Sequence, residues 1–453
     1  MTRLFGTDGI RGEADRFPLD QVTLRTLGAS LTAHLREKLG GGTPVIITGR
    51  DTRESGVRVE RALVEGATAA GAQCKSAGVI TTPGVAFLAR TLPADAGVVI
   101  SASHNPFQDN GVKVFSPTGK KLEDATERMI EADILSASSG EQGELKSLPE
   151  YDSDAALLRK RYLDFLAEEI GRGLSLTDLT MVIDCANGAA SQLAPQLFAR
   201  LGARVVSLND QPDGRNINRD CGSLHPETLQ QRVMVEQADI GVAFDGDADR
   251  ALFVDRAGRF VDGDGAMWVL ANYLHERGEL QHQVVVGTVM SNIGLEIALR
   301  DRGLQLARTD VGDKYVLDEL LRTGASLGGE QSGHLIFPRL SLAGDGIITA
   351  LSLLRAMNEQ GKSLEQLTKG FERYPQILVN VRVREKKPFS DIETVRTLAR
   401  EIETELGDRG RLLLRYSGTE SLARVMIEGQ DQTEIEDHAN RLANTIKLAI
   451  GAL

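Results

Sequence analysis

The sequence SASHNP (Ser101–Pro106) directly follows Ala96–Ile100, an apolar run that predicts a short buried strand. Pro106 disfavours helical φ/ψ at Asn105, so the turn stays extended and its polar side chains point off the strand end. Open α/β sheets bind ligands at the carboxyl ends of their strands. Two hydroxyls and an imidazole at such a place indicate a serine nucleophile with polar support, although a solvated Ser/Asn turn has the same composition.

A second polar loop, DGDADR (Asp245–Arg250), ends the apolar run Asp239–Phe244. Its three carboxylates alternate with small residues and can converge on one hard cation. The loop is no EF-hand, because Arg250 stands at the sixth position and Arg256 at the twelfth, where glycine and glutamate are required. Three carboxylates suit Mg²⁺ shared with a phosphate; the alternative is a solvated acidic turn.

Two later loops carry ligand-binding groups. GEQSGH (Gly329–His334) offers a carboxylate, an amide, a hydroxyl and an imidazole, which suit sugar hydroxyls or an amine, but a polar hairpin is equally plausible. RYSGTE (Arg415–Glu420) lies between two predicted strands, with Arg424 just beyond. Amides around a glycine, two hydroxyls and two arginines predict a phosphate site, the alternative being a plain β-turn.

Two isolated cations stand near these loops in sequence. Arg11, in the glycine-punctuated FGTDGIRG (Phe5–Gly12), could hold a phosphate oxygen or close a surface salt bridge. Lys113 lies in Val112–Phe115, which alternates like a half-exposed strand after a turn at Asp109–Gly111. A solvated strand lysine is the alternative to a functional one.

Composition excludes several classes of protein. The chain has 453 residues, 41% of them hydrophobic and 26% charged, as in large soluble proteins of several domains. A net charge of −12 argues against a nucleic-acid or anionic-membrane partner, and 4% aromatics argues against base-stacking surfaces. The three cysteines have neither disulfide nor metal spacing, and no apolar run is long enough to span a bilayer. We expect a cytoplasmic protein.

The order of predicted elements gives an α/β protein of four domains. Three similar mixed α/β units each present one polar loop at a strand end, in the order serine loop, acidic loop and Glu/Ser/His loop. From about Tyr374 a smaller α+β unit follows, with the phosphate loop. The predicted domains are residues 1–150, 151–256, 257–372 and 373–453. A phosphate receiver, a cation site, a sugar site and a phosphate anchor together indicate phosphoryl transfer.

The chain resembles the α-D-phosphohexomutase superfamily along essentially its whole length, most closely the branch that acts on glucosamine phosphates. The resemblance rests on the five motifs FGTDGIRG, SASHNP, DGDADR, GEQSGH and SGTE, in the order of that superfamily. It implies four domains around a central cleft. It also implies an isomerase that interconverts hexosamine 6-phosphate and 1-phosphate, as a step toward UDP-N-acetylglucosamine and the cell wall.

The resemblance further implies roles for individual residues. The phosphoserine is Ser103, and Ser101 is structural. The metal ligands are Ser103, Asp245, Asp247 and Asp249. The remaining matches are Arg11 and Arg250 for phosphate near the serine, Lys113 and His334 for proton transfer, Glu330 and Ser332 for the sugar, and Arg415, Ser417, Gly418, Thr419 and Arg424 for the distal phosphate.

The implied mechanism passes a phosphoryl group from phospho-Ser103 to the sugar, with Mg²⁺ bound and a glucosamine 1,6-bisphosphate, or another hexose bisphosphate, as activator. A kinase or autophosphorylation must first modify Ser103. A homodimer is also implied. The rival readings are a phosphomannomutase or phosphoglucomutase, a non-catalytic sugar-phosphate sensor, and a metal-dependent phosphatase that uses Ser103.

A few positions depart from the pattern of the superfamily. Tyr416, Ser421 and Ala423 surround the SGTE loop, where proline and larger residues are usual. Lys314 stands where the glucosamine branch commonly has arginine. We expect these departures to affect loop rigidity and phosphate affinity and to leave the chemistry intact.

Overall fold

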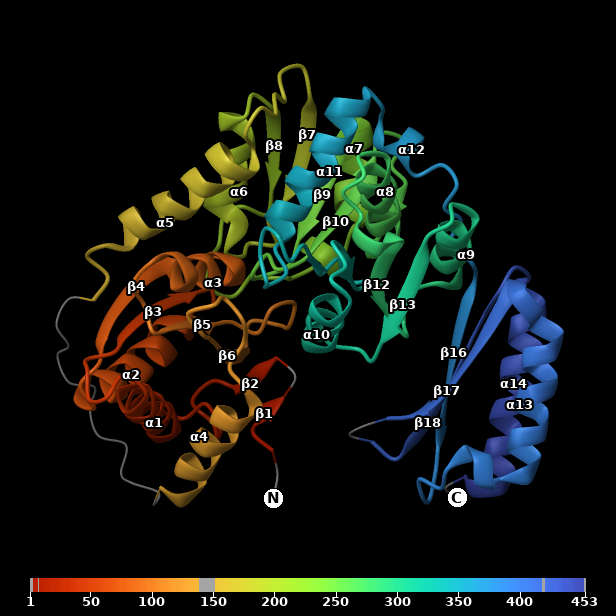
Figure 1. The fold of residues 1–453 in the computed structure, drawn as a ribbon, viewed down its shortest axis with the longest axis horizontal. Coiled ribbons are helices and arrows are strands. Elements are labelled where there is room, and N and C mark those ends of the chain that lie inside the picture. The colour runs from red at the N-terminus through yellow and green to blue at the C-terminus, as the bar shows by residue number, and fades with distance from the viewer. Residues whose placement is uncertain (1–2, 7, 138–150, 418–419, 452–453) are drawn as a thin grey trace. The chain divides into compact units, whose positions relative to one another are not determined.

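The computed structural model describes residues 3–6, 8–137, 151–417 and 420–451 (Figure 1). The chain forms two compact units. The first comprises Met1–Thr288 and Thr309–Thr368, and the second comprises Val289–Arg308 and Lys369–Leu453. The predicted end of the first domain, near residue 150, lies outside the described residues.

The first sheet carries the serine loop. Its six strands have the order β1-β2-β6-β5-β3-β4, with β3 parallel to β4 and β5, and β6 antiparallel to β5 and β2. The strands are β1 (Phe5–Gly6), β2 (Gly9–Glu13), β3 (Val45–Arg50), β4 (Gln73–Val79), β5 (Ala96–Ile100) and β6 (Asp109–Phe115). The helices of this part are α1 (Gln21–Lys38), α2 (Gly56–Ala69), α3 (Thr82–Thr91) and α4 (Asp124–Ser136).

Two predictions about β6 are wrong. Asp109–Gly111 is part of the strand instead of a turn, and the strand is buried along almost its whole length instead of half-exposed. The reason is β2, within the glycine-punctuated N-terminal motif: it pairs with β6, so that β6 lies inside the sheet with β5 on its other side. Lys113 is therefore interior, with 1% of its surface exposed.

The second sheet carries the acidic loop. Its order is β11-β10-β9-β7-β8, with β7 parallel to β8 and β9. The strands are β7 (Thr180–Asp184), β8 (Arg204–Leu208), β9 (Ile240–Phe244), β10 (Ala251–Asp255) and β11 (Phe260–Val261). The helices are α5 (Ala155–Asp164), the π-helical turn η1 (Phe165–Ile170), α6 (Ala190–Arg200), η2 (Gly222–Leu224) and α7 (Glu227–Glu236).

A third group of strands carries the Glu/Ser/His loop. In it β14 pairs parallel with β12 and antiparallel with β15, and the loop connects β14 to β15. The strands are β12 (Val284–Thr288), β14 (Gly328–Gly329) and β15 (Leu335–Ile336). The helices are α8 (Gly263–Glu276), η3 (Gln281–Gln283), α10 (Asp313–Thr323), α11 (Gly346–Gln360) and α12 (Leu364–Leu367).

The second unit contains an antiparallel sheet of order β16-β18-β17, on which α14 packs. Alternate residues of the strands and the apolar faces of α13 and α14 form its core. Its elements are α9 (Ile293–Asp301), β13 (Gln305–Thr309, except its last residue), β16 (Gln376–Arg382), η4 (Phe389–Asp391), α13 (Glu393–Leu406), η5 (Gly407–Arg409), β17 (Gly410–Tyr416), β18 (Leu422–Gly429) and α14 (Gln432–Ile450).

The predicted fold class is confirmed: three α/β parts precede a smaller C-terminal α+β part. Cys74, Cys185 and Cys221 are all free thiols. Within the described part of the chain, no helix combines the length and the apolar character needed to cross a bilayer.

Candidate active site

Ser103 follows the carboxyl end of β5 and is almost fully buried. Its Oγ donates a hydrogen bond to Asp245 Oδ2 at 2.6 Å and lies 3.3 Å from His104 Nδ1. Ser101 has different partners: its hydroxyl donates to Asp51 at 2.7 Å and accepts the Ser103 N–H at 3.0 Å. The geometry thus gives Ser101 a structural role and directs Ser103 toward the carboxylates.

The acidic triplet directly follows the buried strand β9. One carboxylate oxygen from each of Asp245, Asp247 and Asp249 lies within 4.8 Å of the others. Asp247 Oδ1 and Asp249 Oδ1 are buried and have no hydrogen-bond partner among the described residues. Burial, followed by the charges of Asp249 and Asp247, raises the pKa of Asp245 well above its ordinary value. Clustered oxygens that lack donors fit a hard dication such as Mg²⁺.

Lys113 lies between carboxylates from two loops. Its Nζ is 2.9 Å from Asp247, 3.1 Å from Asp8 and 3.4 Å from Asp249. Burial alone would lower the pKa of Lys113, but Asp247 and Asp8 raise it well above its ordinary value. Burial alone would raise the pKa of Asp8, but Lys113 and Lys121 lower it far below its ordinary value. The lysine is therefore a fixed positive charge beside the triplet.

Two histidines of the site have opposite charge states. His334 lies 3.6 Å from Asp249 and 4.0 Å from Asp313. Burial would lower its pKa, but Asp249 outweighs burial and raises the pKa of His334 to about 9. Burial and the neighbouring Arg250 lower the pKa of His104 to about 4. At neutral pH the site thus holds one imidazolium and one neutral imidazole.

Both arginines predicted to bind phosphate near the serine line the site. Arg11 donates to the carbonyl of Ala102 at 3.2 Å and pairs with Asp8. Arg250 Nε lies 3.8 Å from Asp249 Oδ1. The Nε atoms of Arg11 and Arg250 are buried without a hydrogen-bond acceptor in the described part of the chain. Guanidinium donors that lack an acceptor fit a bound phosphate.

The sugar-binding candidates adjoin the same site. Glu330 accepts the Gly312 N–H at 3.0 Å and the Ser332 hydroxyl at 3.1 Å. A cavity of about 450 Å³ brings Glu330 together with the cations and with Asp249 of the triplet. Its lining includes Arg11, Asp249, Arg250, Glu330 and His334.

The distal phosphate candidates belong to the second unit. Arg415 on β17 and Arg424 on β18 are direct cross-strand partners. Ser417 is 3% exposed, and its hydroxyl accepts the Glu420 N–H at 3.2 Å. Arg424 lies 3.6 Å from Glu420. Gly418 and Thr419, two further candidates, lie outside the described residues.

Two of the departures from the family pattern have structural partners. The Tyr416 ring stacks on Phe389, with 4.2 Å between ring centroids and 14° between planes. This stack holds the end of β17 next to the loop. Lys314 forms an ion pair with Asp124 at the start of α4.

Several residues of the site were not predicted from the sequence. Lys121 bridges Asp8 and Asp313, at 2.6 Å from each. The Thr82 hydroxyl donates to Asp247 at 2.5 Å. Asp8 could have been found, because it lies within FGTDGIRG. Lys121, Asp313 and Thr82 lie in stretches without a motif, and only the tertiary fold brings them to the site.

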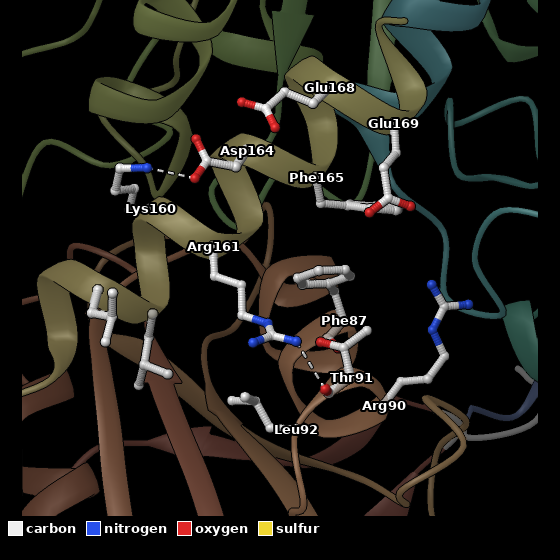
Figure 2. A pocket seen from close by; sticks show the side chains of 12 residues that line it. Phe87, Arg90, Thr91, Leu92, Lys160, Arg161, Asp164, Phe165, Glu168 and Glu169 are labelled. Carbon is white, nitrogen blue, oxygen red and sulfur yellow. Dashed lines mark hydrogen bonds and ion pairs between the residues drawn. The ribbon is translucent and has the colours of Figure 1, made fainter.

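Another cavity, of about 510 Å³, lies between α3 and the α5–η1 segment (Figure 2). The rings of Phe87 and Phe165 stack at its wall with 4.3 Å between centroids, and Arg161 donates to the Thr91 carbonyl at 3.1 Å (Figure 2). Its lining contains none of the candidate residues described above. We therefore assign the chemistry to the site around Ser103.

Comparison with known families agrees with the fold. Models of the phosphoglucomutase/phosphomannomutase family match nearly the whole chain. Alpha/beta/alpha domains I, II and III match residues 2–141, 160–258 and 262–374, and the C-terminal domain matches residues 378–445.

Among curated relatives, the phosphoglucosamine mutase of Solibacter usitatus is 46% identical over 456 residues, covering 99% of each chain. That of Pelotomaculum thermopropionicum is 47% identical over 454 residues, again covering 99% of each chain. A phosphoglucomutase/phosphomannomutase family protein from Burkholderia thailandensis has a similar structure, with a TM-score of 0.79 at 25% identity, over 99% of this chain and 97% of that one. The chain therefore belongs to the phosphoglucosamine mutase family of phosphoryl-transferring isomerases, within the phosphohexomutase superfamily.

Proposed function

We propose that this enzyme interconverts glucosamine 6-phosphate and glucosamine 1-phosphate through phospho-Ser103 and a glucosamine 1,6-bisphosphate. The observation that carries the proposal is the position of Ser103 Oγ, 2.6 Å from a carboxylate of the buried triplet. A phosphoryl group on this oxygen would adjoin the candidate cation site. Relatives that carry the phosphoglucosamine mutase name at 44–47% identity support glucosamine over the neutral sugars of the rival mutases.

The residues present would hold Mg²⁺ through Asp245, Asp247 and Asp249, with a phosphoryl oxygen on Ser103 as a further ligand. The N-acetylphosphoglucosamine mutase of Aspergillus fumigatus, a fold relative at 19% identity, was solved with GlcNAc-6P and magnesium. Bound Mg²⁺ would supply neutralisation of the negative charge on the transferring group.

In the first half-reaction, the bond between phosphorus and Ser103 Oγ breaks as a new bond between phosphorus and O1 of the sugar forms. The O1 proton passes to the groups of the site and finally to Ser103 Oγ. We assign this proton transfer to Lys113 and His334: both are cationic before the reaction, so one of them donates its proton to the departing Ser103 Oγ and recovers a proton from O1. Arg11 and Arg250 hold the phosphoryl oxygens, and the fixed charge of Lys113 offsets the carboxylates that would otherwise repel them.

In the second half-reaction, the bisphosphate turns over and its 6-phosphoryl group returns to Ser103, leaving glucosamine 1-phosphate. Glu330 and Ser332 contact the sugar, and Glu330 can pair with its C2 ammonium. The phosphate that is not reacting binds to Arg415, Ser417, Gly418, Thr419 and Arg424. One anchor for either phosphate fits a reaction in which the sugar presents both ends in turn.

Other parts of the proposal concern the enzyme as a whole. We propose four domains with the boundaries given above, a cytoplasmic homodimer, and first phosphorylation of Ser103 by a kinase or by the enzyme itself. The product would feed synthesis of UDP-N-acetylglucosamine.

The test is the intact mass of the purified protein, followed by turnover of glucosamine 6-phosphate with Mg²⁺ and a trace of the 1,6-bisphosphate. We expect glucosamine 1-phosphate and one phosphate mapped to Ser103. Turnover of only mannose or glucose phosphates would overturn the glucosamine assignment. Release of inorganic phosphate without bisphosphate dependence would favour a phosphatase, and no turnover by phosphorylated protein would favour a sensor. A folded Ser103→Ala variant with near-normal activity would exclude Ser103 as the nucleophile.

A further inference from the structure

Arg53, in the loop after β3, is one of the largest fully buried side chains of the described residues. Its Nε donates to Asp51 Oδ2 at 2.8 Å, and its backbone N–H donates to Asp51 Oδ1 at 3.0 Å. Neither side chain of this pair is exposed to solvent. A buried ion pair of this kind fixes the plane of the guanidinium group.

The two terminal nitrogens of Arg53 donate to backbone carbonyls of the serine loop and of the residues that follow it. One terminal nitrogen donates to the carbonyls of Ser103 at 2.9 Å and Asn105 at 2.8 Å. The other donates to the carbonyls of Pro106 and, at 3.0 Å, Asp109. One guanidinium therefore binds four carbonyl oxygens within a seven-residue segment.

A second side chain binds the same carbonyls from the part of the chain that carries the acidic triplet. Asn218 Nδ2 donates to the carbonyl of Ser103 at 2.9 Å and to that of Asn105 at 3.0 Å. The N–H of Ser103 is also held, by Ser101, whose hydroxyl binds Asp51. Both peptide groups of Ser103 are thus fixed by side chains that the proposed chemistry does not use.

Such support is needed because Ser103 has an unfavourable backbone conformation. Its φ is 53°, in the left-handed region that a residue with a Cβ rarely adopts. Backbone strain of this kind persists only where surrounding contacts over-determine it. The conformation directs Oγ toward Asp245.

We propose that Arg53, oriented by Asp51 and assisted by Asn218, is a positioning residue that holds Ser103 in the geometry needed for phosphoryl transfer. The proposal rests on the proposed function, since it deepens the account of the same nucleophile. A small misplacement of a reacting group costs about 100-fold in rate, whereas binding of the sugar depends on other residues.

The test compares Arg53→Lys with Arg50→Lys. Arg50 lies three residues earlier and pairs with the buried Glu60 at 2.6 Å, so it controls for loss of a guanidinium paired with a buried carboxylate in the same segment. We expect Arg53→Lys to lower kcat per folded enzyme by about 100-fold, with KM for glucosamine 6-phosphate within about 3-fold of wild type. Arg50→Lys should keep wild-type kcat. Wild-type kcat in Arg53→Lys, or a change in KM alone, would overturn the proposal.

A double-mutant cycle with Asn218→Ala provides the second readout. Because both side chains hold the same carbonyls, the combined loss of kcat should be clearly smaller than the product of the single losses. Independent effects that multiply would contradict the shared role. If Arg53→Lys does not fold, the cycle pairs Asn218→Ala with Ser101→Ala. The combined loss of kcat should again be smaller than the product of the single losses.

Hydrogen exchange of the peptide that spans the serine loop separates this inference from the proposed function. Exchange of the Ser103 and Asn105 amides should rise in Arg53→Lys and stay unchanged in Arg50→Lys. Inactive wild-type enzyme with this exchange pattern would overturn the proposed function and leave the positioning role. Active wild-type enzyme with no rise in exchange would overturn the positioning role alone.

Discussion

Ser103 Oγ and Asp245 Oδ2, brought together from loops 142 residues apart, lie 2.6 Å from each other. The contact joins the candidate nucleophile to the candidate cation site in one buried cluster. The reaction then depends on the charge balance of that cluster, and the first two predictions test this dependence.

Chelation should abolish turnover, because the triplet is proposed to bind Mg²⁺ and the charge of the transferring group would be left unneutralised. Treatment with EDTA followed by dialysis should give inactive enzyme, and added Mg²⁺ should restore the rate. Asp247→Asn should shift the Mg²⁺ titration to higher concentration by at least about 10-fold, since it removes one charged ligand. A metal titration of activity measures both effects. Full activity after exhaustive chelation would contradict the assignment.

Lys113→Met should lower both stability and rate. The variant leaves Asp8, Asp247 and Asp249 without their shared cation, and breaking a buried charge network costs about 3–5 kcal/mol of unfolding free energy. Urea unfolding measures the loss. Lys160→Met is the control, because its ion pair with Asp164 is exposed and is expected to contribute below about 1 kcal/mol. Equal losses in the two variants would show that Lys113 has no special role.

The apolar runs of the sequence predicted the buried strands well. Ala96–Ile100 matches β5 residue for residue, and the apolar run Asp239–Phe244 contains β9. Short buried strands have a strong signal because nearly every position is apolar. The half-exposed strand predicted at Val112–Phe115 is wrong, because burial of β6 depends on pairing with β2, a strand distant in sequence and rich in glycine.

Motif residues were found because each motif is local. The contacts of Arg53, Asn218, Lys121 and Asp313 depend on which loops the fold brings together, and no spacing in the sequence encodes this. Nothing in the composition of the segment after β3 indicates that Arg53 binds carbonyls rather than a ligand.

Asp345 should make stability depend on pH. Burial raises its pKa to about 6, despite a 2.6 Å hydrogen bond from Tyr162 and two from backbone amides of α11. A raised carboxyl pKa favours the folded state at low pH, so this stability is lost as pH rises from about 4 through 6. Asp345→Asn removes the ionisation and can keep the helix cap. From pH 5 to pH 8, the unfolding free energy of Asp345→Asn should increase by about 1 kcal/mol relative to that of wild type.

The control for this effect is Asp431→Asn, at the exposed start of α14, where the same capping change occurs without burial. Its difference from wild type should be the same at both pH values in urea titrations. A pH-independent difference for Asp345→Asn as well would mean that the carboxyl of Asp345 does not titrate in this range.

Glu330→Gln should distinguish glucosamine from neutral sugars. If the carboxylate pairs with the C2 ammonium, its loss should lower kcat/KM for glucosamine 6-phosphate by at least about 10-fold, as expected for a charge-assisted hydrogen bond. Turnover of glucose 6-phosphate should fall less. Ser332→Ala, which removes a neutral partner of Glu330, should affect both sugars alike. Equal losses for both sugars in Glu330→Gln would exclude recognition of the amine by this residue.

Arg424→Leu should weaken phosphate binding without changing the chemistry at Ser103. Arg424 is the cross-strand partner of Arg415, and its Nε is buried with no hydrogen-bond partner among the described residues, which leaves a donor for an anion. Loss of one phosphate-binding guanidinium should raise KM for glucosamine 6-phosphate about 10- to 100-fold. Transfer to Ser103 from saturating bisphosphate should change much less, because Arg11 and Arg250 hold the reacting group. Arg441→Leu, on the solvent side of α14, is the matched control and should leave KM unchanged. An unchanged KM in Arg424→Leu would remove this arginine from the phosphate site.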